Sequence, residues 1–147
     1  ENIRKWSLII PESQKKGLIN FSISCDISKP LSNGTMKVPM WNLKGVESLI
    51  SWIGVPNEEL SLENMQGLAK VANGTTVAEI AMLRKKVGNN PADFYKVNAK
   101  TWTLNVRLRN QKFNSEESPI VIHNIIHGET QKNGSIKLSR SADWLCS

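Results

Sequence analysis

The chain has 147 residues, of which 39% are hydrophobic and 22% charged, and its 19 Lys and Arg against 13 Asp and Glu give a net charge of +6. This length suits one domain, and the apolar content is high enough to build a core. No apolar run approaches the roughly 18 residues that a membrane-spanning helix needs, and the composition is neither collagen-like nor of low complexity. We therefore expect a single domain over residues 1–147 with no transmembrane segment.

The first part of the chain has the pattern of β-strands. Residues 5–11 form a short apolar run that ends at a proline, and residues 18–31 alternate apolar with small polar side chains over the cleanest stretch of the sequence. Such alternation predicts a strand with one face in the core. Asn33-Gly34 then separates this run from a second alternating run at 36–40, which predicts a β-hairpin. Pro39 cannot donate to a ladder, so the second strand is expected to lie at a sheet edge or to end at this residue.

The middle of the chain has a helical period. Apolar residues at helical spacing predict helices over residues 42–54 and 61–72. The sequence Thr76-Val77-Ala78-Glu79 is a capping box that opens a third helix, which Gly88 ends. Asn90-Pro91 places a cap residue before a proline and predicts a short fourth helix over 91–98.

Strand patterns return in the last third, at residues 100–109, 119–128 and 135–139. The expected order is therefore β-β-β, three or four helices, then β-β-β. Strands at both ends and helices in the middle indicate the α+β class, because the strands do not alternate with helices one by one. We expect a mostly antiparallel sheet with the helices packed on one face.

Positive charge is concentrated in one region, because residues 84–112 carry a net charge of +7 and the remaining residues sum to −1. This region predicts a surface for nucleic acid, RNA ahead of DNA, or for another polyanion, where phosphate neutralisation dominates affinity. Phe94 and Tyr95 lie in the same region and could stack on bases. The alternative is a solvated face, in which the cations of 84–86 complement a helix dipole. The predicted binding residues are Arg84, Lys85, Lys86, Lys96, Lys100, Arg107, Arg109 and Lys112.

Signals for an enzyme or a metal site are weak. His123 and His127 lie in a β-branched run, and on a strand they would stand roughly 13 Å apart, too far to share an ion. The acidic residues are dispersed, and no phosphate-binding glycine loop or nucleophile motif is present. We expect no catalytic residue, metal or cofactor, and a protein that acts by binding.

Self-association is the alternative function. Trp41 and Trp144 each lie where a strand pattern ends, and one or both could form a contact between copies in a homo-oligomer. Lys outnumbers Arg 14 to 5, a bias often found in proteins of A+T-rich genomes. Together these features favour a viral structural or accessory domain as the alternative to nucleic-acid binding.

The two cysteines, Cys25 and Cys146, belong to no metal-binding or redox motif. Two isolated cysteines predict free thiols in a reducing, intracellular compartment, such as the cytoplasm of a cell or of an infected host cell. A single bridge between them is the other possibility.

Overall fold

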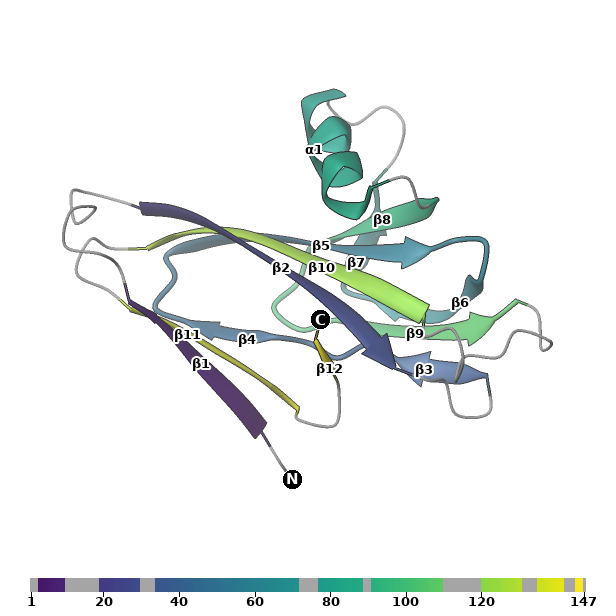
Figure 1. Ribbon diagram of the computed structural model, residues 1–147, viewed down its shortest axis with the longest axis horizontal. Coiled ribbons are helices and arrows are strands. Elements are labelled where there is room, and N and C mark those ends of the chain that lie inside the picture. The colour runs from purple at the N-terminus through teal and green to yellow at the C-terminus, as the bar shows by residue number, and fades with distance from the viewer. Residues whose placement is uncertain are drawn as a thin grey trace.

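The computed structural model describes residues 3–9, 19–29, 34–71, 77–88, 91–109, 120–130, 135–141 and 145–146. This part of the chain is mostly β, with twelve strands and one helix (Figure 1). The elements are β1 (Ile3–Ile9), β2 (Ile19–Lys29), β3 (Thr35–Lys37), β4 (Asn42–Lys44), β5 (Ser48–Pro56), β6 (Leu60–Gln66), β7 (Leu68–Lys70), α1 (Val77–Val87), β8 (Ala92–Val97), β9 (Thr103–Leu108), β10 (Ile120–Thr130), β11 (Ser135–Ser141) and β12 (Leu145–Cys146).

The strands form one large sheet and two small ones. The large sheet has the order β12-β2-β10-β5-β8-β7, and the small sheets have the orders β1-β11-β4 and β3-β9-β6. All the ladders are antiparallel. Figure 1 shows the two small sheets side by side beneath the large one.

The main core lies between the large sheet and the β3-β9-β6 sheet. Ile53 of β5, Ile122 of β10 and Leu104 of β9 are fully buried there and belong to one cluster of packed side chains. Their neighbours along each strand point the other way, as the pleat requires. The fold at this end is therefore a β-sandwich, in which one face of the large sheet is buried against the β3-β9-β6 sheet.

The opposite face of the large sheet is covered by α1. Leu83 and Val87 of the helix are buried against Trp52 of β5, Phe94 of β8 and Ile125 of β10. The central strands of the large sheet are consequently buried on both faces over part of their length.

Strand pairing in the sandwich is nested. β1 pairs with β11, β2 with β10, β3 with β9 and β5 with β8, so the chain is folded back on itself like a long hairpin. This connectivity resembles that of jelly-roll sandwiches. It departs from that pattern because β1, β11 and β4 form a separate sheet and β12 is added beside β2. In addition, β7, the strand after β6, joins β8 in the large sheet instead of returning beside β6. The change of sheet occurs at Gly67, which has φ +73° and where a Cβ would lie 2.5 Å from the carbonyl oxygen of Thr101.

The expected α+β class is wrong, because three of the four expected helices are strands. Residues 42–54 contain β4 and most of β5, and four successive residues of β5, from Trp52 to Val55, are buried. A strand buried on both faces has no polar face, so its apolar run loses the period of two and can imitate a helical stripe. The same holds for β8, where Phe94 and Tyr95 are adjacent and both buried.

A β-bulge explains the wrong helix over residues 61–72. The pairing of β6 with β9 shifts its register between Leu62 and Asn64, so that Leu62 faces Val106 and Met65 faces Leu104. One inserted residue lengthens the apolar spacing from two to three. Leu62, Met65 and Leu68 therefore have a helical spacing although they belong to β6 and β7.

Other expectations are confirmed. The strands expected near residues 5–11, 18–31, 100–109, 119–128 and 135–139 are all present, and the capping-box helix is α1. The hairpin at Asn33-Gly34 is wrong, although Gly34 has the positive φ of a turn residue, because β3 pairs with β9 and not with β2. β3 does lie at a sheet edge.

Cys25 is buried in β2 and is disulfide-bonded, and no described cysteine is free. The expectation of free thiols is therefore wrong for Cys25. The sequence contains one other cysteine, Cys146, and its strand β12 pairs with β2 at the edge of the large sheet. The alternative of a single bridge is the one that the structure favours.

Candidate polyanion-binding surface

A polar cluster fixes α1 to the large sheet. The indole Nε1 of Trp52 donates a hydrogen bond of 2.8 Å to Oε1 of Glu79 in the first turn of α1. The same carboxylate oxygen lies 3.8 Å from Nζ of Lys96, and this ammonium is also 6.0 Å from the centre of the Trp52 ring. Strand β8, strand β5 and the helix thus meet at one carboxylate.

Aromatic and imidazole rings continue this cluster across the sheet. The rings of Trp52 and His127 are edge to face, with centres 5.3 Å apart. At Gly54 an added Cβ would come within 3.1 Å of the Phe94 ring and 3.4 Å of His123. The glycine therefore allows Phe94 and His123 to pack closely beside the base of α1.

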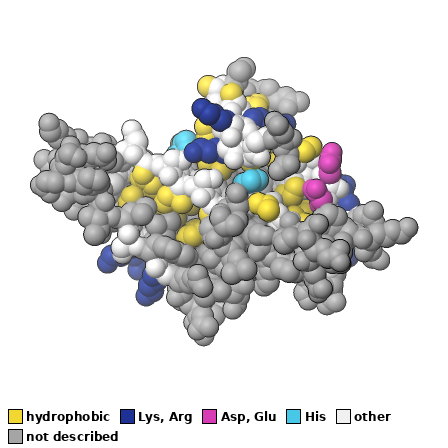
Figure 2. All heavy atoms as spheres, viewed as in Figure 1, with side chains coloured by type: hydrophobic (Ala, Val, Ile, Leu, Met, Phe, Trp, Pro, Cys, Tyr) yellow, Lys and Arg dark blue, Asp and Glu magenta, His cyan; other side chains and the backbone are white. Residues whose placement is uncertain are grey.

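The exposed cations lie on and around the last turn of α1. Arg84, Lys85 and Lys86 are all exposed, and Figure 2 shows dark-blue side chains gathered over the helix on this side of the molecule. The Arg84 guanidinium lies 5.9 Å from the centre of the Phe94 ring. Within the described part of the chain, Lys85 and Lys86 form no ion pair.

A groove of about 450 Å³ separates α1 from β7 and β8. Arg84 lines it from the helix side and Lys70 from β7, while Phe94 and Asp93 contribute to its wall. The Lys70 ammonium is 3.8 Å from the Asp93 carboxylate. We call the group formed by Arg84, Lys85, Lys86 and Lys96 the helix-side surface.

Arg107 lies on the other side of the sandwich. Its neighbours Val106 and Leu108 point toward the core between the sheets, so Arg107 is on the outer face of the β3-β9-β6 sheet. Its guanidinium is 2.7 Å from the Glu63 carboxylate. We call this outer face, which also holds the exposed Lys37, the opposite face.

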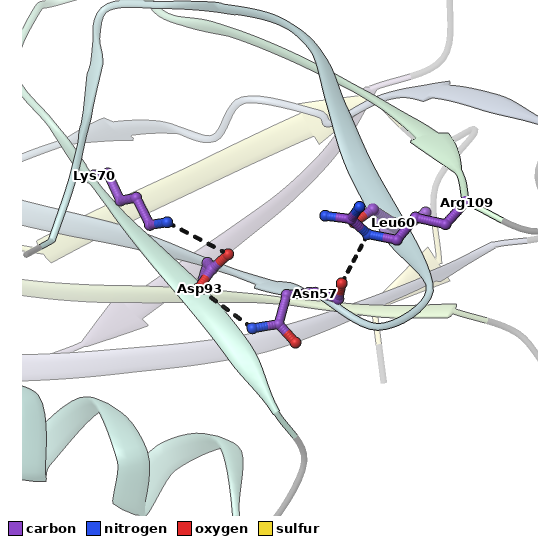
Figure 3. A network of polar contacts seen from close by, with 5 residues as sticks. All are labelled: Asn57, Leu60, Lys70, Asp93 and Arg109. Carbon is purple, nitrogen blue, oxygen red and sulfur yellow. Dashed lines mark hydrogen bonds and ion pairs between the residues drawn. The ribbon is translucent and has the colours of Figure 1, made fainter.

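Arg109 is bound to the turn between β5 and β6. Its Nε donates hydrogen bonds of 2.9 Å to the carbonyl oxygens of Asn57 and Leu60, as Figure 3 shows for this network. The Asn57 amide in turn donates to Asp93, at 3.3 Å. Arg109 therefore has a structural partner for part of its guanidinium.

The remaining predicted residues are scattered. Lys100 is exposed in the connection between β8 and β9, and Trp41 is half-buried between β3 and β4. Lys112 and Trp144 lie outside the described residues. The eight predicted cations are therefore not on one face, and four of them, Arg84, Lys85, Lys86 and Lys96, lie together.

The expected stacking of bases on Phe94 and Tyr95 is wrong, because their exposed fractions are only 6% and 4%. Burial raises the pKa of the Tyr95 hydroxyl above its usual 10.0, with Asp93 adding to the rise and Arg109 opposing it.

The two histidines lie on β10, as expected for a strand. In the described ranges, no three His, Cys, Asp or Glu side chains are grouped closely enough to hold a metal ion. A search of the same ranges finds no helix with the length and apolar character needed to cross a membrane.

Comparison with protein-family models, with curated proteins and with solved structures finds no match to this chain. The argument for function therefore depends on the chemistry of its surfaces alone, since fold does not determine function.

Proposed function

We propose that the protein binds nucleic acid, with single-stranded RNA as the first candidate, or a similar polyanion, through the helix-side surface. The observation that supports this most is the run of three exposed cations at the end of α1, two of which have no ion pair in the described residues. Unpaired surface ammonium groups neutralise phosphates and release counterions, which is the main source of such affinity.

The cluster at Glu79 gives these cations a fixed position. Because Trp52 and Lys96 both contact the Glu79 carboxylate, the helix is attached to β5 and β8 at its first turn. Arg84 of its last turn lines the groove between α1 and the strands β7 and β8. A polyanion lying along the last turn of α1 would contact these cations, and its binding would depend on charge more than on base sequence.

The test is the salt dependence of binding to a fluorescent 20-nucleotide RNA, measured by anisotropy between 50 and 200 mM salt. Each phosphate contact on a single strand contributes about −0.7 to the slope of log K against log salt. The double variant K85A/K86A should therefore make the slope shallower by about 1.4. A duplex DNA arm separates single-strand from duplex preference.

The matched control is K37A/R107A, which removes the same charge from the opposite face and should leave the slope nearly unchanged. Equal effects of the two double variants would mean that net charge and not the helix-side surface carries the binding. Absence of salt-sensitive binding to any nucleic acid would overturn the proposal.

Self-association is the second candidate, supported by two exposed apolar side chains that are neighbours in sequence and point to opposite faces of β5. Leu49 and Ile50 of β5 have exposed fractions of 47% and 45%. Exposed apolar groups of this kind can mark a contact between copies. Light scattering over a range of concentrations tests it, with Ile50→Ser expected to lower any apparent mass above that of the monomer, and a monomer at all concentrations contradicting it.

The intracellular, reducing location stays a prediction, and the disulfide bond at Cys25 speaks against it. Disulfides persist mainly in oxidising compartments.

A further inference from the structure

A second site is a cavity away from α1 that opens to solvent on one side. It is a cavity of about 760 Å³ between the large sheet and the strands beneath it, within the usual size range for small-molecule sites. The wall comes from β5 and β10 above, from the segment joining β3 to β5 below, and from the connection between β8 and β9 at the side.

Most of the residues that line the cavity have apolar side chains. Two tryptophans, Trp41 and Trp102, lie on the walls, and both are half-buried. Aromatic rings of this size give a ligand a large contact area at little cost in flexibility. The other large apolar side chains of the wall are Met40, Leu43, Leu49 and Ile126.

One polar side chain is buried in this apolar wall. Asn124 of β10 has an exposed fraction of 2%, lines the cavity, and its Oδ1 has no hydrogen-bond partner in the described part of the chain. Buried amide oxygens are nearly always paired, because an unpaired one loses its water without compensation. A group inside the cavity that donates a hydrogen bond would satisfy this oxygen.

The rim is polar and open to solvent. Asn98, Ala99 and Lys100 are exposed and line the cavity, and Leu49 is also exposed at its edge. A small molecule can therefore enter without rearrangement of the sheets.

We propose that this cavity binds an amphipathic small molecule, with an apolar body between Trp41 and Trp102 and a hydroxyl or amide N–H that donates to Asn124. The proposal is independent of polyanion binding, because no residue of the helix-side surface lines the cavity.

The test uses 1-decanol and methyl nonyl ether, two isomers of which only the alcohol can donate a hydrogen bond. Binding to the full chain is measured by calorimetry and by quenching of tryptophan fluorescence. One hydrogen bond of ordinary strength should make the alcohol bind about tenfold more tightly than the ether. Asn124→Leu should bind the two equally, because it removes the acceptor while keeping the branched shape of the side chain.

Two further variants keep the result interpretable. Asn105→Leu is the matched control, since Asn105 also has a buried, unpartnered Oδ1 but does not line the cavity, so it should keep the tenfold preference. Ala99→Trp at the exposed rim should block both probes without disturbing the core.

Three results would overturn the proposal. These are the absence of binding by either probe at its solubility limit, a preference for the alcohol that survives in Asn124→Leu, and unchanged binding in Ala99→Trp. Tighter binding of adenosine monophosphate than of 1-decanol, with the same dependence on Asn124, would also overturn it and assign the cavity to nucleotides.

Discussion

The two outer surfaces of the sandwich carry similar residues but different chemistry. On the helix-side surface, Lys85 and Lys86 have no ion pair in the described residues. On the opposite face, Arg107 is bound to Glu63. Because a paired cation already has a carboxylate partner, Lys85 and Lys86 have more charge to offer a polyanion than Arg107 has. The comparison shows that the local partner of a cation, and not the density of cations along the chain, decides whether it can bind.

The strongest test of this comparison weakens the packing of α1 on the large sheet. Leu83→Ala should lower the free energy of unfolding by about 2–5 kcal/mol, because Leu83 is fully buried against the sheet. It should also weaken RNA binding by the folded protein, since the cations of α1 lose their fixed place. Leu104→Ala is the matched control, equally buried but in the core between the sheets. Denaturant melts and anisotropy measure both effects, and equal binding by the two variants would contradict the comparison.

A second test affects neither surface directly. Reducing the disulfide of Cys25, or replacing this residue by Ala, should destabilise the protein by about 2–4 kcal/mol, since the unfolded chain gains freedom. The edge at β12 and β2 lies apart from the helix-side surface, so the affinity for RNA should stay the same. Thermal melts with and without reductant measure the change, and a loss of RNA binding below the melting range would link the edge to the surface.

A third test releases a paired cation on the opposite face. Glu63→Gln removes the carboxylate from Arg107, and in the K85A/K86A background any gain in RNA binding must come from outside α1's last two lysines. One released cation should steepen the salt slope by about 0.7, half of what the double variant removes. Anisotropy over the same salt range measures it. If the slope does not change, pairing with Glu63 is not what keeps Arg107 from binding.

The smallest effect concerns Tyr95, which lies beside the network that holds Arg109. Its pKa is raised in the folded state, so the folded protein holds this proton more tightly than the unfolded chain. The associated stability is fully present below pH 10 and is lost as the pH rises from 10 through the folded pKa. Denaturant melts between pH 9 and 11 should show a steeper decline for the native protein than for Tyr95→Phe. Parallel declines would exclude a contribution from Tyr95.

Sequence patterns predict a helix or strand correctly where one of its faces is polar. They fail where both faces are buried. The alternation of β2 and β9 and the capping box of α1 are visible in the sequence because each element has a solvent-exposed face. β5 and β8 lack one, since α1 covers one face and the sandwich core the other, and β6 has a bulge that changes its period. The covering element is far away in the chain, so no local pattern could reveal it.

Prediction of the binding residues from the sequence has the same limit. The run at Arg84–Lys86 is correctly placed on a helix end, but the separation of Arg107 from it depends on which sheet each strand joins. Asn124 did leave a signal, because His123 and Asn124 are neighbours in a strand and one of the two must point inward.

The nested pairing also has a consequence for how the chain acquires its fold. β2 must find β10 about a hundred residues away, and β1 must find β11 at a still greater separation. This gives a high contact order, and proteins of this kind fold in milliseconds to seconds because large loops must close before any contact is gained. During synthesis from the N-terminus, β2 leaves the ribosome long before its partner exists. Until β10 has been synthesised, the apolar face of β2 at Phe21 and Ile23 can pair with the wrong strand. Slow collapse of the nascent chain, or a chaperone, would prevent this mispairing.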